Sequence, residues 1–414
     1  QKALLHGLGK EKVRVDYVTV DGRETYWYIE WEGALAAVMR RYQEAQSDAQ
    51  REKLGVQVVF DCHDERLIQN PDTKEIVGCY TLMGTDETPK AVKASKGVIL
   101  CTGGFEFNEE LQAKYLKCYP MRGFYGWKYN EGDGIKIAQK VGADLWHMQQ
   151  VCGGDDAWFD DPEIVPGGVS VSSPTPNYIK VNRLGERWGE KDTSSPHGGW
   201  KPYANFNEEI CDFDRIPSWY VFDQTSFEGG SWGGMVGGAA KENGGMGIGY
   251  MTEGLDPELG GWEGWSADNV WELERGWITQ GATLDELAAN LAKSKWDDKM
   301  DADKLKASVE RWNELVDKGV DEDFGKPARD LIALKTPPFY GVPLGGSLLT
   351  TMDGLRINSN LQVLNQADYE PIEGLYAIGD TSGGFFCNNY PELYVGVASG
   401  RSLTWAYLAA LELA

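Results

Sequence analysis

The chain has 414 residues, too many for one compact core, so two domains are expected. Hydrophobic residues make up 42% and charged residues 25%, which argues against a disordered or collagen-like protein. The formal net charge of −24 argues against nucleic acid or anionic lipid as a partner, because both require a basic surface.

Tryptophan and glycine are abundant, with 16 and 51 residues respectively. So many tryptophans favour heavy packing of buried aromatic side chains, and the alternative is an aromatic pocket for a planar substrate. The seven cysteines include no C-x-x-C pair, so neither a metal site nor a haem attachment is expected. The sequence has no run of about 18 apolar residues and no leading signal peptide, which predicts no membrane span and favours a cytoplasmic location.

Apolar periodicity in the first part of the chain predicts helices over 33–49, 108–117 and 133–142, and strands over 56–62, 76–83 and 91–101. The last of these strands ends in the continuous apolar run Val98 to Leu100, and Thr102-Gly103-Gly104 follows. Buried parallel strands have this pattern, with glycines where the chain leaves the carboxyl end of the strand.

Residues 152–335 differ in character, since they are rich in Gly, Trp, Ser and Asn. The elements predicted in this region are strands at 178–181 and 219–222 and helices at 284–295 and 302–318. Thr283, followed three residues later by Glu286, has a capping-box pattern at the start of the first of these helices. The stretch 225–264 is glycine-rich and weakly periodic, as in a wrapped functional loop or a mobile cap.

Strand-and-turn character returns at residue 336, and a closing helix is predicted over 397–413. The layout is therefore two domains, of which the first is discontinuous. Residues 1–151 and 336–414 are expected to form one body, and residues 152–335 an inserted cap.

The run that ends in Gly379-Asp380 carries the strongest chemical signal. An apolar strand that leads into Gly-Asp is typical of a doubly wound fold beside a cofactor. The glycine allows a close approach of the backbone, and the carboxylate accepts a hydrogen bond from a hydroxyl group. The alternative is an ordinary turn in which Asp380 caps a helix.

Seven segments resemble, in order, the FAD-binding family that contains soluble fumarate reductases, urocanate reductases and 3-ketosteroid Δ1-dehydrogenases. They are 98–108 (VILCTGGFEFN), 130–147 (NEGDGIKIAQKVGADLWH), 179–190 (IKVNRLGERWGE), 302–326 (ending in GVDEDFGK), 336–342 (TPPFYGV), 352–357 (MDGLRI) and 374–384 (GLYAIGDTSGG). The resemblance implies an α/β fold with a Rossmann-like FAD-binding domain, incomplete in this chain, and an inserted α+β cap. It also implies that FAD is the cofactor and that a small-molecule substrate lies between cap and flavin.

The resemblance assigns FAD contacts to both glycine turns. Asp380, after Gly379, is similar to the acidic residue that holds the ribityl chain. Thr102, Gly103 and Gly104 resemble the turn beside the adenosine-pyrophosphate end.

Further FAD contacts follow from the same resemblance. The backbone near Cys62 and His63, at the end of a strand, resembles the adenine contact. Gly132 and Asp133 resemble the start of a helix near the active cleft.

The segment that opens the last helix resembles the family's flavin-facing helix. Val395, Gly396 and Val397 are accordingly expected near the pyrimidine edge of the flavin. There the positive end of the helix dipole and the free N–H groups favour a reduced, anionic flavin.

One part of the family pattern is missing from the sequence. No G-x-G-x-x-G follows a strand near the start, so the family's opening strand, phosphate turn and helix are absent. We expect a second polypeptide to supply them in a hetero-oligomer, and the alternative is a truncated chain. The first residue is Gln1 rather than Met, which keeps a processed, truncated or second-subunit origin open.

The residues that grip a dicarboxylate in the family are also missing. Its dicarboxylate reducers carry an Arg before the final helix and a His near the MDGL motif, where this chain has 388–391 (NNYP) and 348–350 (LLT). The stretch with the proton-donating Arg is replaced by 208–219, in which Arg215 lies nearby. Since an Arg pair binds a carboxylate bidentately, its loss argues against fumarate.

The same region resembles the ketosteroid dehydrogenase pattern, in which a Tyr hydroxyl and a Gly amide polarise a ketone oxygen. Tyr390 and Gly396 are the matching residues, and Tyr394 is the alternative donor because the spacing differs. Tyr125 is a further candidate for proton transfer.

The resulting hypothesis is hydride transfer between flavin N5 and a carbon–carbon double bond conjugated to a carbonyl group, in either direction, with a ketosteroid- or enone-like substrate. A second possibility is a reductase of aromatic or unsaturated carboxylic acids that uses Arg122, Arg215 or Arg401 for the carboxylate. A third is a non-catalytic scaffold subunit that has lost its flavin.

Overall fold

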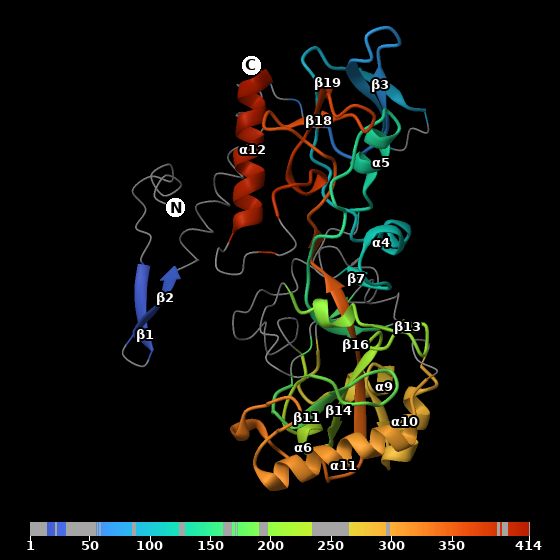
Figure 1. Cartoon of the computed structure of the whole chain (residues 1–414), viewed down its shortest axis with the longest axis vertical. Helices are drawn as coiled ribbons and strands as arrows, with labels where there is room; N and C mark the ends of the chain where they lie inside the picture. Colours follow the sequence, from blue (N-terminus) through green and yellow to red (C-terminus); the bar gives the residue numbers. More distant parts are fainter. Residues whose placement is uncertain are drawn as a thin grey trace. The chain divides into compact units, whose positions relative to one another are not determined.

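The computed structural model describes residues 15–20, 23–29, 55, 57, 59–84, 88–123, 129–159, 168–169, 171, 173–189, 198–233, 265–294, 299–386, 390 and 396–413 (Figure 1). The chain divides into two compact units, one formed by Gln1–His63 with Leu82–Pro89 and the other by Asp64–Thr81 with Lys90–Ala414. The first unit contains an antiparallel hairpin of β1 (Val15–Val20) and β2 (Arg23–Ile29). The helix predicted at 33–49 lies outside the described residues.

A three-stranded sheet has the order β3 (Cys62–Gln69), β4 (Ile76–Met83), β5 (Lys90–Lys93). The prediction for β4 is confirmed, but the strand predicted at 56–62 is wrong, because β3 begins where that strand was expected to end. β3 is mostly polar at its start, so pairing with β4 rather than apolar alternation makes it a strand. The Arg66 guanidinium also lies 4.2 Å from the ring centroid of Tyr80 on β4.

A second three-stranded sheet has the order β18 (Gln362–Leu364), β19 (Pro371–Ala377), β6 (Val98–Leu100). β19 and β6 are parallel, so their carboxyl ends lie at the same edge. The single strand predicted over 91–101 is in fact two strands, β5 and β6. They part at Gly97, where an added Cβ would lie 3.0 Å from the Gly374 carbonyl oxygen.

Two short helices cover this sheet, as the sequence predicts: α4 (Glu109–Tyr115) and α5 (Asp133–Gln139). Asn108 caps α4 by accepting a hydrogen bond from the backbone N–H of Leu111 at 3.0 Å. Leu111 and the α5 residues Ile135 and Ile137 are buried in the same apolar core as Leu375 of β19. This packing fixes the loops that leave β6.

The cap is built on a seven-stranded, largely antiparallel sheet within the described residues. Its strands are β7 (Arg122–Gly123), β9 (Asp155–Trp158), β10 (Gly168–Val169), β11 (Tyr178–Val181), β14 (Ser218–Asp223), β15 (Thr279–Gly281) and β16 (Phe339–Leu348). Smaller elements around it are β12 (Phe206–Asn207), β13 (Asp212–Phe213), α6 (Gln224–Phe227) and α9 (Val270–Arg275).

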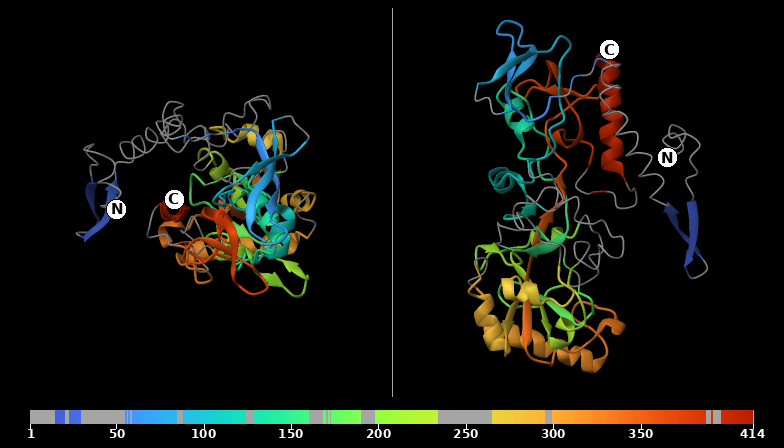
Figure 2. Two further views of the ribbon diagram at one scale, coloured as in Figure 1. Left: turned by 90° about the horizontal axis from the view of Figure 1, so that it is seen from above. Right: turned by 180° about the vertical axis from the view of Figure 1, so that it is seen from behind.

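Helices α10 (Leu284–Leu291) and α11 (Ala302–Lys318) cover one face of the cap sheet (Figures 1 and 2). They bury apolar side chains such as Leu287 and Trp312 against Ile179 and Val221 of the sheet. The opposite face carries a large aromatic cluster. Its fully or nearly fully buried rings include Trp158, Trp188, Trp200, Tyr203, Tyr220, Phe222 and Trp232.

β16 runs from the cap towards the second sheet. The predicted cap limit at residue 335 falls just before this strand, which pairs with β14, β9 and β15. Immediately after β16, β17 (Thr350–Thr351) pairs with β8 (Val151–Cys152). The hydrogen bonds of the cap sheet therefore extend along the chain to Leu348, beyond the predicted cap limit. The limits of the three predicted domain segments stay a prediction.

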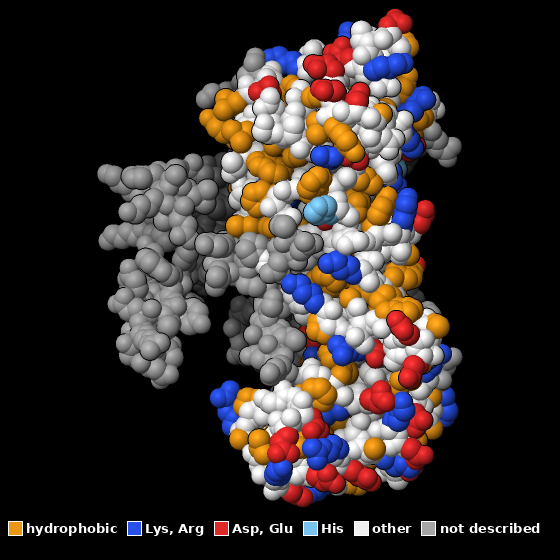
Figure 3. Space-filling view, in the orientation of Figure 1, with side chains coloured by type: hydrophobic (Ala, Val, Ile, Leu, Met, Phe, Trp, Pro, Cys, Tyr) orange, Lys and Arg blue, Asp and Glu red, His pale blue; other side chains and the backbone are white. Residues whose placement is uncertain are grey.

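The closing helix α12 (Val397–Leu413) has the predicted bounds. Trp405 and the buried Ala409 pack against Tyr376 and Ile378 at the end of β19. The outer side of α12 is also apolar, and hydrophobic side chains gather over it in Figure 3. The exposed apolar residues of α12 are Leu403, Tyr407, Leu408 and Leu411.

Candidate functional site

The two predicted glycine turns meet at the carboxyl edge of β6 and β19. The hydroxyl oxygens of Thr102 and Thr381 lie 3.3 Å apart, and the Thr381 hydroxyl donates to the Gly103 carbonyl at 3.0 Å. Gly379, in the left-handed conformation, begins the second turn, and the Ser382 hydroxyl donates to its carbonyl at 2.7 Å. Because parallel strands end at one edge, turns 275 or more residues apart form one wall.

Gly104 allows that wall to close on β17. A Cβ added there would lie 2.2 Å from the Thr351 hydroxyl oxygen and 2.5 Å from Oε2 of Glu106. The backbone N–H of Phe105 donates to the same Thr351 hydroxyl at 2.7 Å. The position therefore requires glycine, since any side chain would push the turn away from Thr351.

Glu106 is a buried carboxyl group that joins three segments. It accepts hydrogen bonds from the Asn130 amide at 2.6 Å and from the backbone N–H and hydroxyl of Thr351, each at 3.2 Å. Burial raises the pKa of Glu106 to about 7, although the hydrogen bond from Asn130 lowers it. The Glu106 carboxyl group consequently binds its proton at a higher pH than an exposed glutamate does.

Gly132 and Asp133 lie at the start of α5, beside the same turn. The N–H of Gly132 donates to the Gly104 carbonyl at 3.0 Å, and Gly132 has a φ of +75°. Asp133 forms an ion pair with Lys136 at 2.8 Å. The structure thus brings Gly132 directly to the turn and places Asp133 in the first turn of the adjoining helix.

Asp380 presents a carboxylate in this wall. One of its oxygens accepts from the Thr350 hydroxyl at 3.1 Å, and the other forms an ion pair with Arg401 of α12. The Asp380 side chain is 25% exposed, whereas the Arg401 side chain is fully buried. Burial raises the pKa of Asp380, and the charge of Arg401 and the Thr350 hydroxyl lower it.

The start of α12 closes the site. Gly396 has a φ of +77°, and among the described residues no atom lies within 4 Å of a Cβ added there. The Tyr390 ring lies 5.4 Å from the Phe386 ring and packs with Met352, next to β17. Tyr390 therefore lies beside β17, the strand that contains Thr350.

Some predicted site residues are not tested by this geometry. Tyr125, Tyr394 and Val395 lie outside the described residues. Cys62 and His63 belong to the first unit and begin β3 instead of ending a strand. Their proposed contact with adenine stays a prediction.

The sequence analysis missed a buried polar network behind the wall, formed by Glu106, Thr350, Thr351, Asp353 and Arg401. Asp353 Oδ2 accepts from the backbone N–H groups of Gln149 and Gln150 at 3.1 and 2.8 Å, and burial raises the pKa of its carboxyl. Glu106 and Asp353 both lie within quoted motifs, so an acidic residue beside each glycine turn was the available signal.

The aromatic face of the cap contains one buried ion pair. Lys180 of β11 pairs with Asp155 of β9, and its ammonium lies 5.2 Å from the ring centroid of Tyr220. Arg215 lies with its guanidinium 4.8 Å from the ring centroid of Trp188 and donates to the Pro202 carbonyl at 3.0 Å. These cations are held within the cap by aromatic rings and by their own partners.

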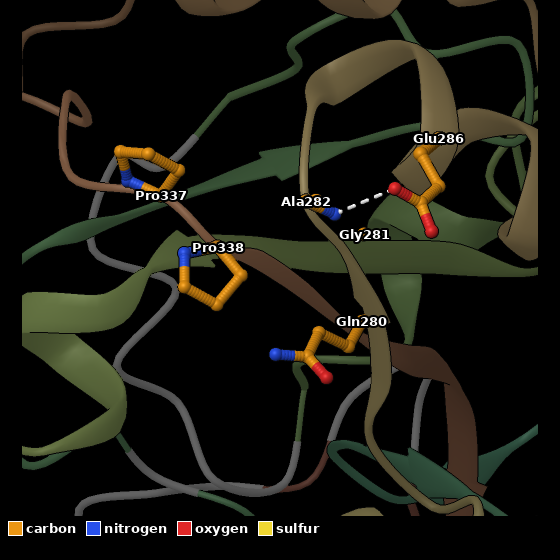
Figure 4. Close-up of a pocket in the computed structure, with 6 residues that line it drawn as sticks. All are labelled: Gln280, Gly281, Ala282, Glu286, Pro337 and Pro338. Atoms are coloured by element: carbon orange, nitrogen blue, oxygen red, sulfur yellow. Dashed lines mark hydrogen bonds between the residues drawn. The ribbon is translucent and has the colours of Figure 1, made fainter.

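A separate pocket of about 480 Å³ lies in the cap (Figure 4). Its lining consists of Gln280, Gly281, Ala282, Glu286, Pro337 and Pro338. Glu286 turns to Ala282 and accepts its backbone N–H at 3.0 Å, while the Glu286 N–H donates to the Thr283 hydroxyl at 3.2 Å. The capping pattern predicted at the start of α10 accounts for the position of the Glu286 carboxylate. The pocket includes none of the residues of the candidate site.

The sequence matches the family described as FAD binding domain over residues 10–391. The 3-oxosteroid 1-dehydrogenases of Mycolicibacterium smegmatis and Mycobacterium tuberculosis are 29% and 30% identical to it; the matches cover 82% and 79% of the chain, and 56% and 54% of the relatives. The vinyl phenol reductase of Lactiplantibacillus plantarum is 26% identical, over 92% of the chain and 72% of that relative. The chain thus spans about half the length of the first two relatives.

Two solved structures share the fold. A 3-ketosteroid delta1-dehydrogenase from Sterolibacterium denitrificans has a TM-score of 0.62 and 21% identity, over 92% of this chain and 67% of that structure. The open conformation of a flavocytochrome c3 fumarate reductase has a TM-score of 0.59 and 19% identity, over 100% of this chain and 61% of that structure. These likenesses and the family match confirm the predicted fold class.

Within the part of the chain that the structure describes, no helix has both the length and the apolar character needed to cross a bilayer. Each relative contains, in one polypeptide, both the part that this chain matches and a part that it does not match. The relatives therefore give no support to the predicted second polypeptide. The family match confirms the expected cofactor, FAD. From the ordered motifs, the two joined glycine turns and this match, the chain belongs to the FAD binding domain family.

Proposed function

We propose that the chain forms part of a flavoenzyme that transfers hydride between FAD and a carbon–carbon bond next to a carbonyl group. The observation that carries the proposal is the meeting of the Thr102–Gly104 turn, Asp380 and the start of α12 at one edge of the sheet. When bound there, FAD supplies N5 as the hydride donor or acceptor.

The residues present fit one end of this cofactor. Asp380 keeps a partly exposed carboxylate that can accept a hydrogen bond from a ribityl hydroxyl group. Gly396 lies directly before α12, at the end of the helix where the dipole favours negative charge. The left-handed Gly379 brings the backbone of the second turn to the same wall.

Tyr390 and Gly396 are proposed to hold the substrate carbonyl. A phenol hydroxyl and a backbone N–H that both donate to one oxygen stabilise the negative charge that develops on it during hydride transfer. Packing of Tyr390 against Phe386 and Met352 supports this role, because it places the ring beside β17. Tyr394 remains the alternative donor, and a Tyr of the cap is proposed to move the proton.

An uncharged substrate fits the site better than a carboxylic acid. Of the arginines considered for a carboxylate, Arg401 is buried against Asp380, and Arg215 is stacked on Trp188 and bonded to Pro202. The 3-oxosteroid 1-dehydrogenases and the vinyl phenol reductase are named for uncharged ring compounds. We therefore favour a ketosteroid- or enone-like substrate, with dehydrogenation and ene reduction both open.

Participation of a second polypeptide in the FAD site, as a hetero-oligomer, is a further part of the proposal. Intact mass spectrometry of the native protein tests it, because a hetero-oligomer would give a second mass that the chain itself does not account for. A single mass for the native flavoprotein would rule the companion chain out.

The first test of the function is the absorbance of the purified native protein. We expect a yellow flavin spectrum that dithionite bleaches. A ketosteroid that is dehydrogenated should bleach the oxidised flavin, and an enone that is reduced should restore the colour of the reduced flavin. A colourless protein that takes up no FAD would overturn the proposal, whatever the substrate.

Replacement of Tyr390 by Phe tests the carbonyl-binding role. Loss of one donor to a developing oxyanion is expected to lower kcat by about a hundredfold to a thousandfold, with little change in bound FAD. Tyr407→Phe is the matched control, because Tyr407 is 65% exposed on the outer side of α12. Unchanged turnover in Tyr390→Phe would transfer the role to Tyr394.

A further inference from the structure

Arg401 is a fully buried cation on a helix that carries one other charged residue. Its guanidinium lies 5.0 Å from the ring centroid of Phe386, 5.3 Å from that of Trp405 and 5.4 Å from that of Phe385. Burying an unpaired guanidinium costs several kcal/mol, so the charge must be compensated inside the protein. The aromatic faces contribute to this compensation through cation–π attraction.

One carboxylate compensates Arg401 directly. Nη2 of Arg401 forms an ion pair with Oδ1 of Asp380, whereas its Nε and Nη1 are buried without a hydrogen-bond partner among the described residues. Oδ2 of Asp380 is bound by the Thr350 hydroxyl at 3.1 Å. The one hydrogen bond that the guanidinium makes to a described residue thus fixes the orientation of Asp380.

Other titratable groups face this pair from every neighbouring element. Asp353 and Tyr390 both interact electrostatically with Arg401. The Oδ1 atom of Asp353 is also buried and has no hydrogen-bond partner within the described part of the chain. Glu106 interacts with Asp380 as a second carboxylate. Two carboxyl groups, those of Asp380 and Asp353, therefore act on one buried cation, and a third, that of Glu106, acts on Asp380.

We propose that Arg401 is a positioning residue that keeps the Asp380 carboxylate ionised and turned toward FAD. This inference rests on the proposed function, since it assigns the reason why Asp380 can accept a hydroxyl group of the cofactor. Arg401 itself is enclosed by the rings and by Asp380, so it acts through Asp380 rather than on FAD.

The consequence is a pH dependence that the native protein suppresses. Burial raises the pKa of Asp380, and Arg401 is the main opposing influence, followed by the Thr350 hydrogen bond. Without the guanidinium, burial and the negative charges of Glu106 and Asp353 would act alone. Asp380 would then bind a proton at a higher pH than in the native protein, and a neutral carboxyl group is a weaker acceptor for a hydroxyl.

The test is the dissociation constant of FAD, measured by flavin fluorescence between about pH 5.5 and about pH 9. Native protein is expected to bind FAD almost equally over this range. Arg401→Met is expected to lose roughly tenfold to a hundredfold in affinity on going from the alkaline to the acid end. Arg401→Lys, which keeps the charge, should recover most of the flat profile.

Asp380→Asn is the reference variant, because an amide does not titrate in this range. It is expected to bind FAD weakly at every pH, and addition of Arg401→Met to it should cause no further pH-dependent loss. If Arg401→Met alone keeps the native profile, or if the two substitutions add, the inference is wrong. If the native protein binds no FAD, the proposed function fails instead.

If Arg401→Met fails to fold, a second variant still tests the inference. Thr350→Val removes the other hydrogen-bond donor to Asp380 and leaves the buried charge intact. We expect a smaller shift of the pH profile in the same direction, about threefold to tenfold in affinity at the acid end. A flat profile in Thr350→Val, as flat as that of the native protein, would contradict the inference.

Discussion

Asp321 and Arg187 form the most enclosed bidentate ion pair of the described cap. Their two hydrogen bonds measure 3.0 and 2.7 Å, and the Asp321 side chain is fully buried. The Arg187 guanidinium lies 4.6 Å from the ring centroid of Trp312, and the backbone N–H of Lys326 donates to Asp321 at 2.9 Å. The pair therefore ties α11, the loop after it and the β11 side of the cap together.

Asp321→Asn is expected to lower the free energy of unfolding by about 3 kcal/mol, because it leaves the Arg187 charge buried and unpaired. Burial alone would raise the pKa of Asp321, but Arg187 and the backbone N–H groups outweigh it and hold the pKa below its ordinary value. The native protein should accordingly lose this stability only as the pH falls below about 4.

Urea unfolding at several pH values measures both effects. Asp323→Asn is the matched control, since Asp323 pairs with Arg311 on the surface and the change should cost less than about 1 kcal/mol. Equal losses in the two variants would show that burial of the Asp321 pair adds nothing.

At the scale of elements, Glu106 connects the turn after β6 to β17 and to the loop before α5. The folded pKa of its carboxyl, about 7, lies above the ordinary value of 4.5, so the group stabilises the fold when protonated. That contribution is complete below about pH 4.5 and is lost as the pH rises through about 7. The protein should lose about 3 kcal/mol of stability over this window from Glu106.

Glu106→Gln is expected to flatten this part of the stability profile, since an amide keeps the shape of the side chain but does not titrate. The midpoint of urea unfolding, followed from about pH 4 to about pH 8, gives the comparison. Glu109→Gln, an exposed change in the first turn of α4, serves as the control and should follow the native curve. A Glu106→Gln curve as steep as the native one would contradict the assigned cause.

Helices with strong local signals could be predicted to the residue. α11 begins after Asp301, whose side chain accepts from the N–H groups of Asp303 and Lys304, and it ends at Gly319 in the left-handed conformation. Both signals lie within a few residues of the helix. The strand beginning at Cys62 was missed because its partner, β4, decides its conformation and its own polar sequence does not.

Some residues of the candidate site could likewise be predicted from the sequence, and others could not. Gly379, Asp380 and the Thr102–Gly104 turn could be located from sequence, because each follows an apolar strand. Thr351 could not, since its role depends on Glu106, which is 245 residues away in the chain. Arg401 was considered only as a carboxylate ligand, because helical periodicity does not reveal a buried ion pair with a turn.

On the scale of the whole molecule, the net charge of the chain and the charged groups of the candidate site point to the same kind of substrate. The net charge of −24 creates a field that disfavours the approach of dicarboxylates. Within the described site, Arg401 is already matched by Asp380, and carboxyl groups outnumber it. Long-range repulsion and the pairing of Arg401 with Asp380 thus both support the neutral substrate proposed above.

The passage of β16 into β17 has a mechanical consequence. Residues 339–348 are hydrogen-bonded into the cap sheet, and only Leu349 separates them from Thr350, the hydroxyl partner of Asp380. Any tilt of the cap sheet must therefore be absorbed within one peptide unit or be transmitted to that hydroxyl. A displacement of the cap sheet would therefore shift the Thr350 hydroxyl and, through its hydrogen bond, the Asp380 carboxylate.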